Sequence, residues 1–387
     1  MKVISIRRCF YLCLCCLSMF FSYPGGVSAT AYADGGAPQL AYVAGGGLGV
    51  SVIDIAKRRV TGTMALAGDP RTVLLSLDGN ILYVTEPALG RVVAIMAKTG
   101  KTLCAASLPG QPSLLALSLD ATVLYVAGQG DSRVRALNSA TCAIEHIFET
   151  REPVYGLAVA ASRAPNATPS TPNQLWITGR TSLTVFEVNG HLLGSIPIAG
   201  GPQNICIPGG FTAYVTTRQG TVVAVDLATR TVLRVLLQGG QFGPMDYDAN
   251  TGEVYVPDRE HNLLDVLSPV TTNTPAHGQE LARIISLNSS PQSVAITNDG
   301  QLGFVALANG QVLMLDIPGR SVITSISVGG NPHFIITGLY PSSNSTAPSQ
   351  SVPATMPVSL ILLVSLLVLV VVLMMIWLLR KFLQKRV

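Results

Sequence analysis

Residues 201–227 read GPQNICIPGGFTAYVTTRQGTVVAVDL and contain the phrase that decides the fold. A turn ending in Pro202 is followed by Tyr214-Val215-Thr216 and then by Val225-Asp226. This three-part phrase recurs, with close copies, down most of the chain, and the prolines are 42, 41, 49, 42, 47 and 41 residues apart. A period near ~40–45 residues is typical of a β-propeller blade. The recurring prolines are Pro70, Pro112, Pro153, Pro202, Pro244, Pro291 and Pro332.

Each repeat reads as four short strands separated by turn residues. In the unit after Pro70 we expect strands over residues 72–77, 81–85, 92–96 and 103–108. Alternation of apolar and polar residues is imperfect on the inner strands. That is expected where both faces of a strand pack against neighbouring blades.

The two ends of the repeat region supply one further blade. Pro332 opens a first strand that runs to Leu339, after which the pattern stops. The N-terminal part starts in the middle of a unit, at Tyr42-Val43-Ala44. Six complete units and this split one make seven, within the range of four to eight for propellers. We therefore predict an all-β, seven-bladed β-propeller over residues 38–340, closed by a blade from both ends.

Two positions of the repeat have a structural interpretation. An aromatic residue recurs in the second strand, as in Tyr83, and suits packing between adjacent blades. An aspartate near the end of the third strand, at Asp226, Asp265 and Asp316, can accept backbone N–H bonds and fix the next turn.

The N-terminus has the features of a secretory signal over residues 1–33. Basic residues precede an apolar stretch, and small residues follow it. Cleavage after Ala33 or after Ala29 fits the small-x-small rule. The alternative is an uncleaved anchor, for which the apolar stretch is short.

The C-terminus predicts a membrane anchor. Residues 357–379 carry no charge and are long enough for the roughly 30 Å core of a bilayer. Residues 380–387 form a basic tail, which marks the cytoplasmic side. The Ser/Pro/Thr-rich residues 341–356 read as a stalk. We expect a single-pass protein of the cell membrane with an extracytoplasmic propeller. A buried core helix is the alternative for the apolar segment.

Charge and cysteine content narrow the function classes. The formal net charge of +4 is modest and lies partly in the terminal segments, so it does not predict nucleic-acid binding. Cys104, Cys142 and Cys206 remain after the signal, without metal-ligand spacing. We expect Cys206 to be a small core residue. A Cys104–Cys142 disulfide is open but not favoured, because the two occupy non-equivalent places in successive repeats.

The motifs resemble the YVTN family of bacterial and archaeal β-propeller repeats. Tyr83-Val84-Thr85, Tyr214-Val215-Thr216 and the opening Gly329-Gly330-Asn331-Pro332 carry the resemblance over residues 38–340. It implies an exported seven-bladed propeller, often in surface-layer proteins. Related propellers include quinoprotein dehydrogenase subunits, the nitrous oxide reductase propeller domain and a sugar-acid lactonase. Trp176 and Phe304 stand where other repeats have tyrosine, so the resemblance does not extend to any single protein of the family.

Propellers usually bind ligands at one mouth of the central channel, where the first strands begin. The residue after each recurring proline approximates that ring, and Arg71, Gln203, Gln292 and His333 are the candidate contacts for a polar ligand. The alternative is that these positions are ordinary loop residues that bind no ligand. We assign no catalytic, cofactor-binding or metal-binding residue and expect no cofactor. The whole ring is Arg71, Ser113, Val154, Gln203, Met245, Gln292 and His333.

Two functions remain open from the sequence. The first is a membrane-anchored, non-catalytic binding or cell-envelope scaffold module, whose partner would be a protein or an envelope polymer. The second is an enzyme or enzyme subunit with its site at the channel mouth, lactonase-like or quinoprotein-dehydrogenase-like. An enzyme should gather ionisable groups with perturbed pKa values at the mouth.

Overall fold

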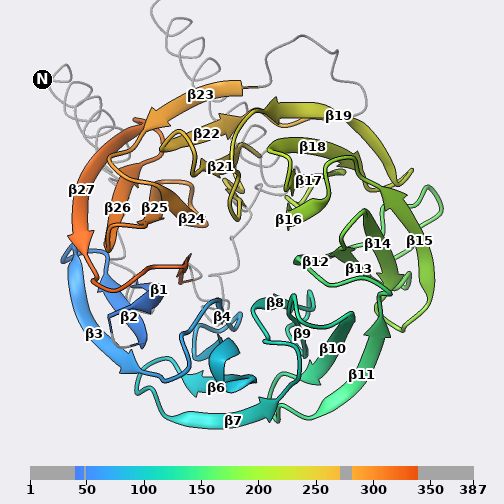
Figure 1. The fold of residues 1–387 in the computed structure, drawn as a ribbon, viewed down its shortest axis with the longest axis horizontal. Coiled ribbons are helices and arrows are strands. Elements are labelled where there is room, and N and C mark those ends of the chain that lie inside the picture. The colour runs from blue at the N-terminus through green and yellow to red at the C-terminus, as the bar shows by residue number, and fades with distance from the viewer. Residues whose placement is uncertain (1–39, 48, 271–280, 339–387) are drawn as a thin grey trace, which may run out of the picture. The chain divides into compact units, whose positions relative to one another are not determined.

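The chain folds into seven four-stranded antiparallel sheets around a common centre, which is a seven-bladed β-propeller (Figure 1). The computed structural model describes residues 40–47, 49–270 and 281–338. Within these ranges the one helical element is the short 3-10 helix η1 (Pro87–Leu89). The expected all-β, seven-bladed fold is confirmed.

In six blades the strands follow one another outward from the centre in chain order, and in the seventh the last strand of the chain, β28, is innermost (Figure 1). The innermost strands are β4 (Val73–Leu75), β8 (Leu114–Leu117), β12 (Gly156–Ala160), β16 (Pro202–Cys206), β20 (Asp246–Tyr247), β24 (Pro291–Ile296) and β28 (Phe334–Thr337). The second strands are β5 (Ile81–Glu86), β9 (Val123–Ala127), β13 (Gln174–Thr178), β17 (Thr212–Thr217), β21 (Val254–Asp258), β25 (Leu302–Leu307) and β1 (Leu40–Gly46).

The two outer layers complete each sheet, and the outermost strands form the rim (Figure 1). The third strands are β6 (Arg91–Met96), β10 (Arg133–Asn138), β14 (Ser182–Glu187), β18 (Thr221–Asp226), β22 (Leu263–Leu267), β26 (Gln311–Asp316) and β2 (Gly49–Asp54). The outermost strands are β7 (Thr102–Ser107), β11 (Ile144–Glu149), β15 (Leu192–Pro197), β19 (Thr231–Gln238), β23 (Leu281–Ser286), β27 (Ser321–Ser327) and β3 (Arg59–Ala65).

One blade joins the two ends of the propeller, as the sequence predicts. Strand β28 is its inner strand and pairs antiparallel with β1, from Ala41 opposite Thr337 to Ala44 opposite Phe334. Pairing the last strand with the first gives both ends hydrogen-bond partners that an open sheet edge would lack. The predicted split blade is confirmed.

The repeated aromatic residue packs between neighbouring blades. Tyr83 of β5 shares a buried cluster with Leu124 and Val126 of the following blade. Trp176, which stands in place of a tyrosine, is fully buried and lies in one cluster with Val215 of the following blade. The core is therefore a set of inter-blade layers.

The aspartates of the repeat fix the outer turns in two blades. Asp226 accepts hydrogen bonds from the Thr229 backbone N–H at 2.6 Å and from its hydroxyl at 2.8 Å. Asp316 accepts the backbone N–H of Gly319 at 3.1 Å. These carboxylates satisfy turn donors next to the last residues of their strands.

Asp265 does not have this role, so its prediction is wrong. It lies in the middle of β22, opposite Val256, and is buried. Strand β22 extends two residues further, to Leu267, so Asp265 does not adjoin the turn. Burial raises its pKa to about 6.

A disulfide joins Cys104 to Cys142, contrary to the preference drawn from the sequence. Cys104 belongs to β7 at the rim of one blade, and Cys142 lies in the turn between β10 and β11 of the next. Non-equivalent positions meet because an outer strand packs sideways against the following blade's outer turn, a shift that a comparison of repeats does not reveal. Cys206 is free and buried, as expected.

The predicted terminal segments lie outside the described residues. They are the signal over residues 1–33, the stalk over 341–356, the membrane helix over 357–379 and the tail over 380–387. Among the described residues, no helix has the length and apolar character to cross a membrane.

Candidate functional site

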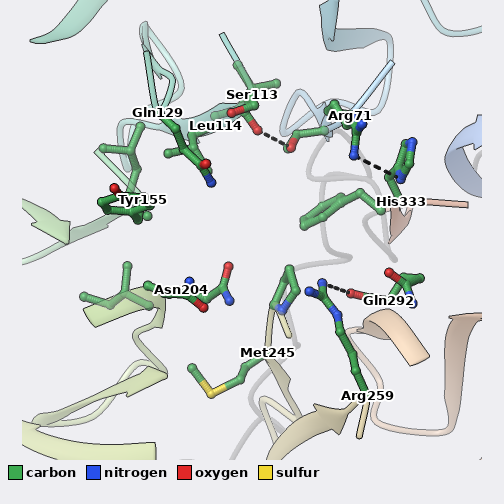
Figure 2. A pocket seen from close by; sticks show the side chains of 18 residues that line it. Arg71, Ser113, Leu114, Gln129, Tyr155, Asn204, Met245, Arg259, Gln292 and His333 are labelled. Carbon is green, nitrogen blue, oxygen red and sulfur yellow. Dashed lines mark hydrogen bonds between the residues drawn. The ribbon is translucent and has the colours of Figure 1, made fainter. Parts of the chain in front are cut away.

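The loops that lead into the inner strands surround a cavity of about 380 Å³, the mouth cavity (Figure 2). Each of these loops joins the rim of one blade to the inner strand of the next. All four candidate contacts, Arg71, Gln203, Gln292 and His333, line it. Ser113 and Met245 of the predicted ring also line it, whereas Val154 is fully buried and its neighbour Tyr155 takes its place.

The threonine of the repeated phrase holds the inner strands at this mouth. The Thr85 hydroxyl oxygen accepts the backbone N–H of Thr72 at 3.0 Å. Thr216 likewise accepts the backbone N–H of Asn204 at 3.0 Å. Both threonines are fully buried in second strands. The threonine that recurs in the second strands therefore positions the first residues of the inner strands, which differ between blades.

One side of the mouth cavity carries a hydrogen-bonded triangle of Asp69, Arg71 and His333. Arg71 pairs with the Asp69 carboxylate at 3.0 Å, and its Nη1 lies 3.4 Å from His333 Nδ1. His333 Nε2 lies 3.2 Å from Asp69 Oδ1. Because a guanidinium can only donate, Nδ1 accepts and the Nε2–H donates to Asp69.

The triangle requires a neutral imidazole. Burial and the positive charge of Arg71 lower the pKa of His333 below its ordinary value, and Arg259 adds to this effect. The opposing influence of Asp69 does not cancel them. The Asp69 carboxylate thus balances the positive charge of Arg71, and the neutral imidazole of His333 accepts a hydrogen bond from Arg71.

Arg259 faces the same cavity from the loop between β21 and β22, and the sequence reasoning missed it. Its guanidinium donates to the backbone carbonyl of Gln292 at 3.1 Å and makes no ion pair with any described residue. Its Nε is buried without a hydrogen-bond partner in the described ranges. Burial lowers the pKa of Arg259, because removal of water disfavours the charged form.

The neighbouring carboxylate does not neutralise Arg259. Asp258 accepts the backbone N–H of Gln241 at 3.2 Å and of Glu260 at 3.0 Å, and its other oxygen lies 2.7 Å from His261 Nδ1. Both carboxylate oxygens of Asp258 thus have partners other than Arg259. The positive charge of Arg259 therefore faces the cavity without a carboxylate from the described lining residues to balance it.

Amide and aromatic groups complete the lining. Gln129, Gln203, Asn204 and Gln292 offer both donors and acceptors. The Arg218 guanidinium lies over one face of the Tyr155 ring, 5.2 Å from the ring centroid. Gln129 and Arg259 were missed because they come from second-to-third strand turns, which end at the same mouth. An inspection of those turns as well as the proline-led loops would have included them.

A second cavity of about 300 Å³ adjoins the mouth cavity further along the inner strands. Met245 and Phe334 line both, so they stand between the two. Asp246 lines this inner cavity and accepts the backbone N–H of Ile296 at 2.7 Å. Burial raises the pKa of Asp246 to about 6.

The mouth cavity has the chemistry of a polar binding site. The residues that line it within the described ranges include two arginines, one histidine and four amides, and no aspartate or glutamate. Among the described residues, no group of three or more His, Cys, Asp or Glu side chains could hold a metal ion. Its one imidazole is held neutral between two partners.

Comparison with known proteins shows the fold alone. No protein-family model matches the chain, and no curated protein matches it by sequence. The resemblance to the YVTN family is therefore not confirmed.

Solved structures match the propeller at low identity. A functionally unknown protein from Desulfotomaculum acetoxidans superposes with a TM-score of 0.63 at 13% identity, over 78% of this chain and 99% of that one. Hydrazine synthase of Kuenenia stuttgartiensis and the Cps50 (Swd1) β-propeller domain of Myceliophteria thermophila each give 0.58 at 14% identity, over 70% of this chain and 90% of theirs. This chain is similar to them in architecture, and the set includes both enzymes and non-enzymes.

Proposed function

We propose that this protein is a non-catalytic binding module that takes its ligand at the mouth cavity. The observation that carries the proposal is convergence: loops from different blades direct arginine, amide and tyrosine side chains into one cavity (Figure 2). A rigid scaffold that presents variable loop residues around a concave site is the usual arrangement for binding.

The sequence supports display of this module outside the cell. The signal over residues 1–33, the apolar segment over 357–379 and the basic tail over 380–387 favour one orientation. In that orientation the propeller projects from the membrane on the stalk of residues 341–356. The partner would then be a protein or a polymer of the cell envelope, and nucleic acid is not expected.

The enzyme alternative is not favoured. A general acid or base needs a side chain free to exchange a proton with the ligand. His333 is engaged on both nitrogens, with Arg71 and with Asp69. The remaining polar side chains of the lining are guanidinium, amide and hydroxyl groups.

Capture of envelope components tests the binding role. Full-length protein, purified in detergent and immobilised, is incubated with an envelope extract from its own source. A Gln203→Ala/Gln292→Ala variant should retain less of the captured component than the unchanged protein does. An Arg133→Ala variant is the control, because the exposed Arg133–Glu149 pair lies outside the mouth cavity. Equal capture by all three proteins would contradict the proposal.

A further inference from the structure

The mouth cavity has an uneven balance of charge. Arg71 and Arg259 both line it, together with His333, and the described lining residues contain no carboxylate. Asp69, which lies just outside this lining, is hydrogen-bonded to both Arg71 and His333. One positive charge is thus compensated by the protein, and that of Arg259 is not.

The position of Arg259 is built into the fold. Its backbone N–H donates to the Gln241 carbonyl at 2.9 Å, and its own carbonyl accepts the Ser290 hydroxyl at 3.1 Å. A β-carbon on Gly243 would lie 3.0 Å from the Gln292 carbonyl oxygen and 3.3 Å from two guanidinium nitrogens of Arg259, so glycine at this place leaves room for this hydrogen-bonded pair. Figure 2 shows the side chain reaching toward the centre of the cavity.

The Arg259 side chain is half-buried, and the residues that line the cavity with it supply no carboxylate to balance its charge. Arg259 retains one hydrogen bond, to the Gln292 carbonyl, while its Nε has no partner among the described residues. A planar guanidinium matches a carboxylate or phosphate through paired N–H donors. An oxyanion in the cavity would supply both the missing charge and the missing acceptors.

The two arginines act on one region of the cavity. Both arginines line the cavity with His333, and after burial their positive charges add to the lowering of the His333 pKa. The amides of Gln129 and Asn204 lie on the opposite side of the cavity in Figure 2. A ligand held there would meet positive charge at one end and neutral hydrogen-bonding groups at the other.

We infer that the mouth cavity binds an anionic ligand whose carboxylate or phosphate group accepts hydrogen bonds from Arg259 and faces Arg71. The amides bind the uncharged polar part of the same ligand. This inference rests on the proposed binding function and names the chemical class of the ligand.

Titration calorimetry on the full-length protein in detergent, at constant ionic strength, tests it with simple probes. Succinate and inorganic phosphate are compared with the neutral analogues succinamide and trimethyl phosphate. At least one anion should bind saturably at one site, and neither neutral analogue should. Binding of succinate alone indicates a carboxylated ligand, and binding of phosphate alone a phosphorylated one. No binding by either anion, or equal binding by a neutral analogue, overturns the inference.

Variants locate the site. Arg259→Met, which keeps the length of the side chain, should weaken anion binding about 10- to 100-fold, the range of a lost charge-assisted hydrogen bond. Arg259→Lys should restore part of the affinity, and Arg133→Met should leave it unchanged. If Arg259→Met binds the anion as well as the unchanged protein, the inference is wrong.

Two further measurements keep the result interpretable. Should Arg259→Met fail to fold, Gly243→Ala, whose methyl group would crowd the Gln292 carbonyl and the Arg259 guanidinium that donates to it, must weaken anion binding for the inference to stand. Competition separates the two proposals. If the captured envelope component is lost in the mouth variant but is not displaced by any anion, the ligand class is wrong and the binding function stands. If neither capture nor anion binding occurs, both fall.

Discussion

The interior of the blades and the mouth cavity are built from opposite kinds of repetition. Between blades the same type of residue returns in every copy, as with Tyr83, Tyr125 and Tyr214, all fully buried. At the mouth the equivalent position after each proline varies in chemical type, from Arg71 to Gln203 to Met245. Repetition thus makes the scaffold, and divergence makes the site. Changes in the interior should therefore affect stability, and changes at the mouth should affect binding.

The largest effect is expected from an interior truncation. Trp176→Ala should lower the free energy of unfolding by about 3–5 kcal/mol, because a fully buried indole leaves a cavity between two blades. Denaturant unfolding measures this. Trp176→Phe is the matched control and should cost less, since a phenylalanine already serves at the same place, Phe304, in another blade. A loss below about 1 kcal/mol for the alanine variant would refute the interior role.

The disulfide is the next largest contribution. Replacing Cys104 and Cys142 by serine should cost about 3–4 kcal/mol, because the bond closes a loop with a sequence separation of 38 residues. Thermal unfolding of the oxidised protein and the double variant measures the difference. A thiol count that finds both cysteines free in the oxidised protein would contradict the bond.

Asp246 gives a pH-dependent effect at the boundary between scaffold and mouth. Its pKa of about 6 in the folded protein lies above the ordinary value of 3.8, so the folded state holds the proton more tightly. The neutral carboxyl of Asp246 favours the folded state below about pH 4, and this contribution to the free energy of unfolding is lost as the pH rises through 6. Asp246→Asn should remove this loss and stabilise the protein at pH 8 by up to about 3 kcal/mol.

The control for Asp246 is the same comparison at low pH. At pH 4 the variant and the unchanged protein should have similar stability, because the carboxyl is then protonated in the folded state. A variant that is less stable at pH 8 would show that the carboxylate is not buried at a cost.

His333 should have the smallest effect on stability and the opposite sign of pH dependence. Its pKa is lowered in the folded protein, so the folded state binds the proton less tightly than the unfolded chain. Stability should fall as pH drops below the ordinary histidine pKa of 6.5. His333→Gln should be less sensitive over that range in melting temperature. An equal pH profile for the two proteins would indicate that the triangle with Asp69 and Arg71 is not formed in solution.

The sequence predicts the mouth only through the loops that its repeat marks. The position after each proline identified Arg71, Gln203, Gln292 and His333, since each inner strand begins there. Arg259 follows a second strand, and nothing local distinguishes it from any exposed turn residue. Arg259 keeps an unbalanced charge because the Asp258 carboxylate accepts backbone N–H groups of Gln241 and Glu260, and this arrangement exists only in the folded loop.

The chain's own repeat determines the number of blades, the split closing blade and the inter-blade aromatics, because strand periodicity and turn chemistry are local properties. Only the tertiary structure decided the Cys104–Cys142 bond, the place of Asp265 and the uncompensated charge of Arg259. Each of these depends on a sideways contact or on burial, and therefore on how far one blade is shifted against the next. That offset is set by packing between blades and is not encoded in the spacing of a single repeat.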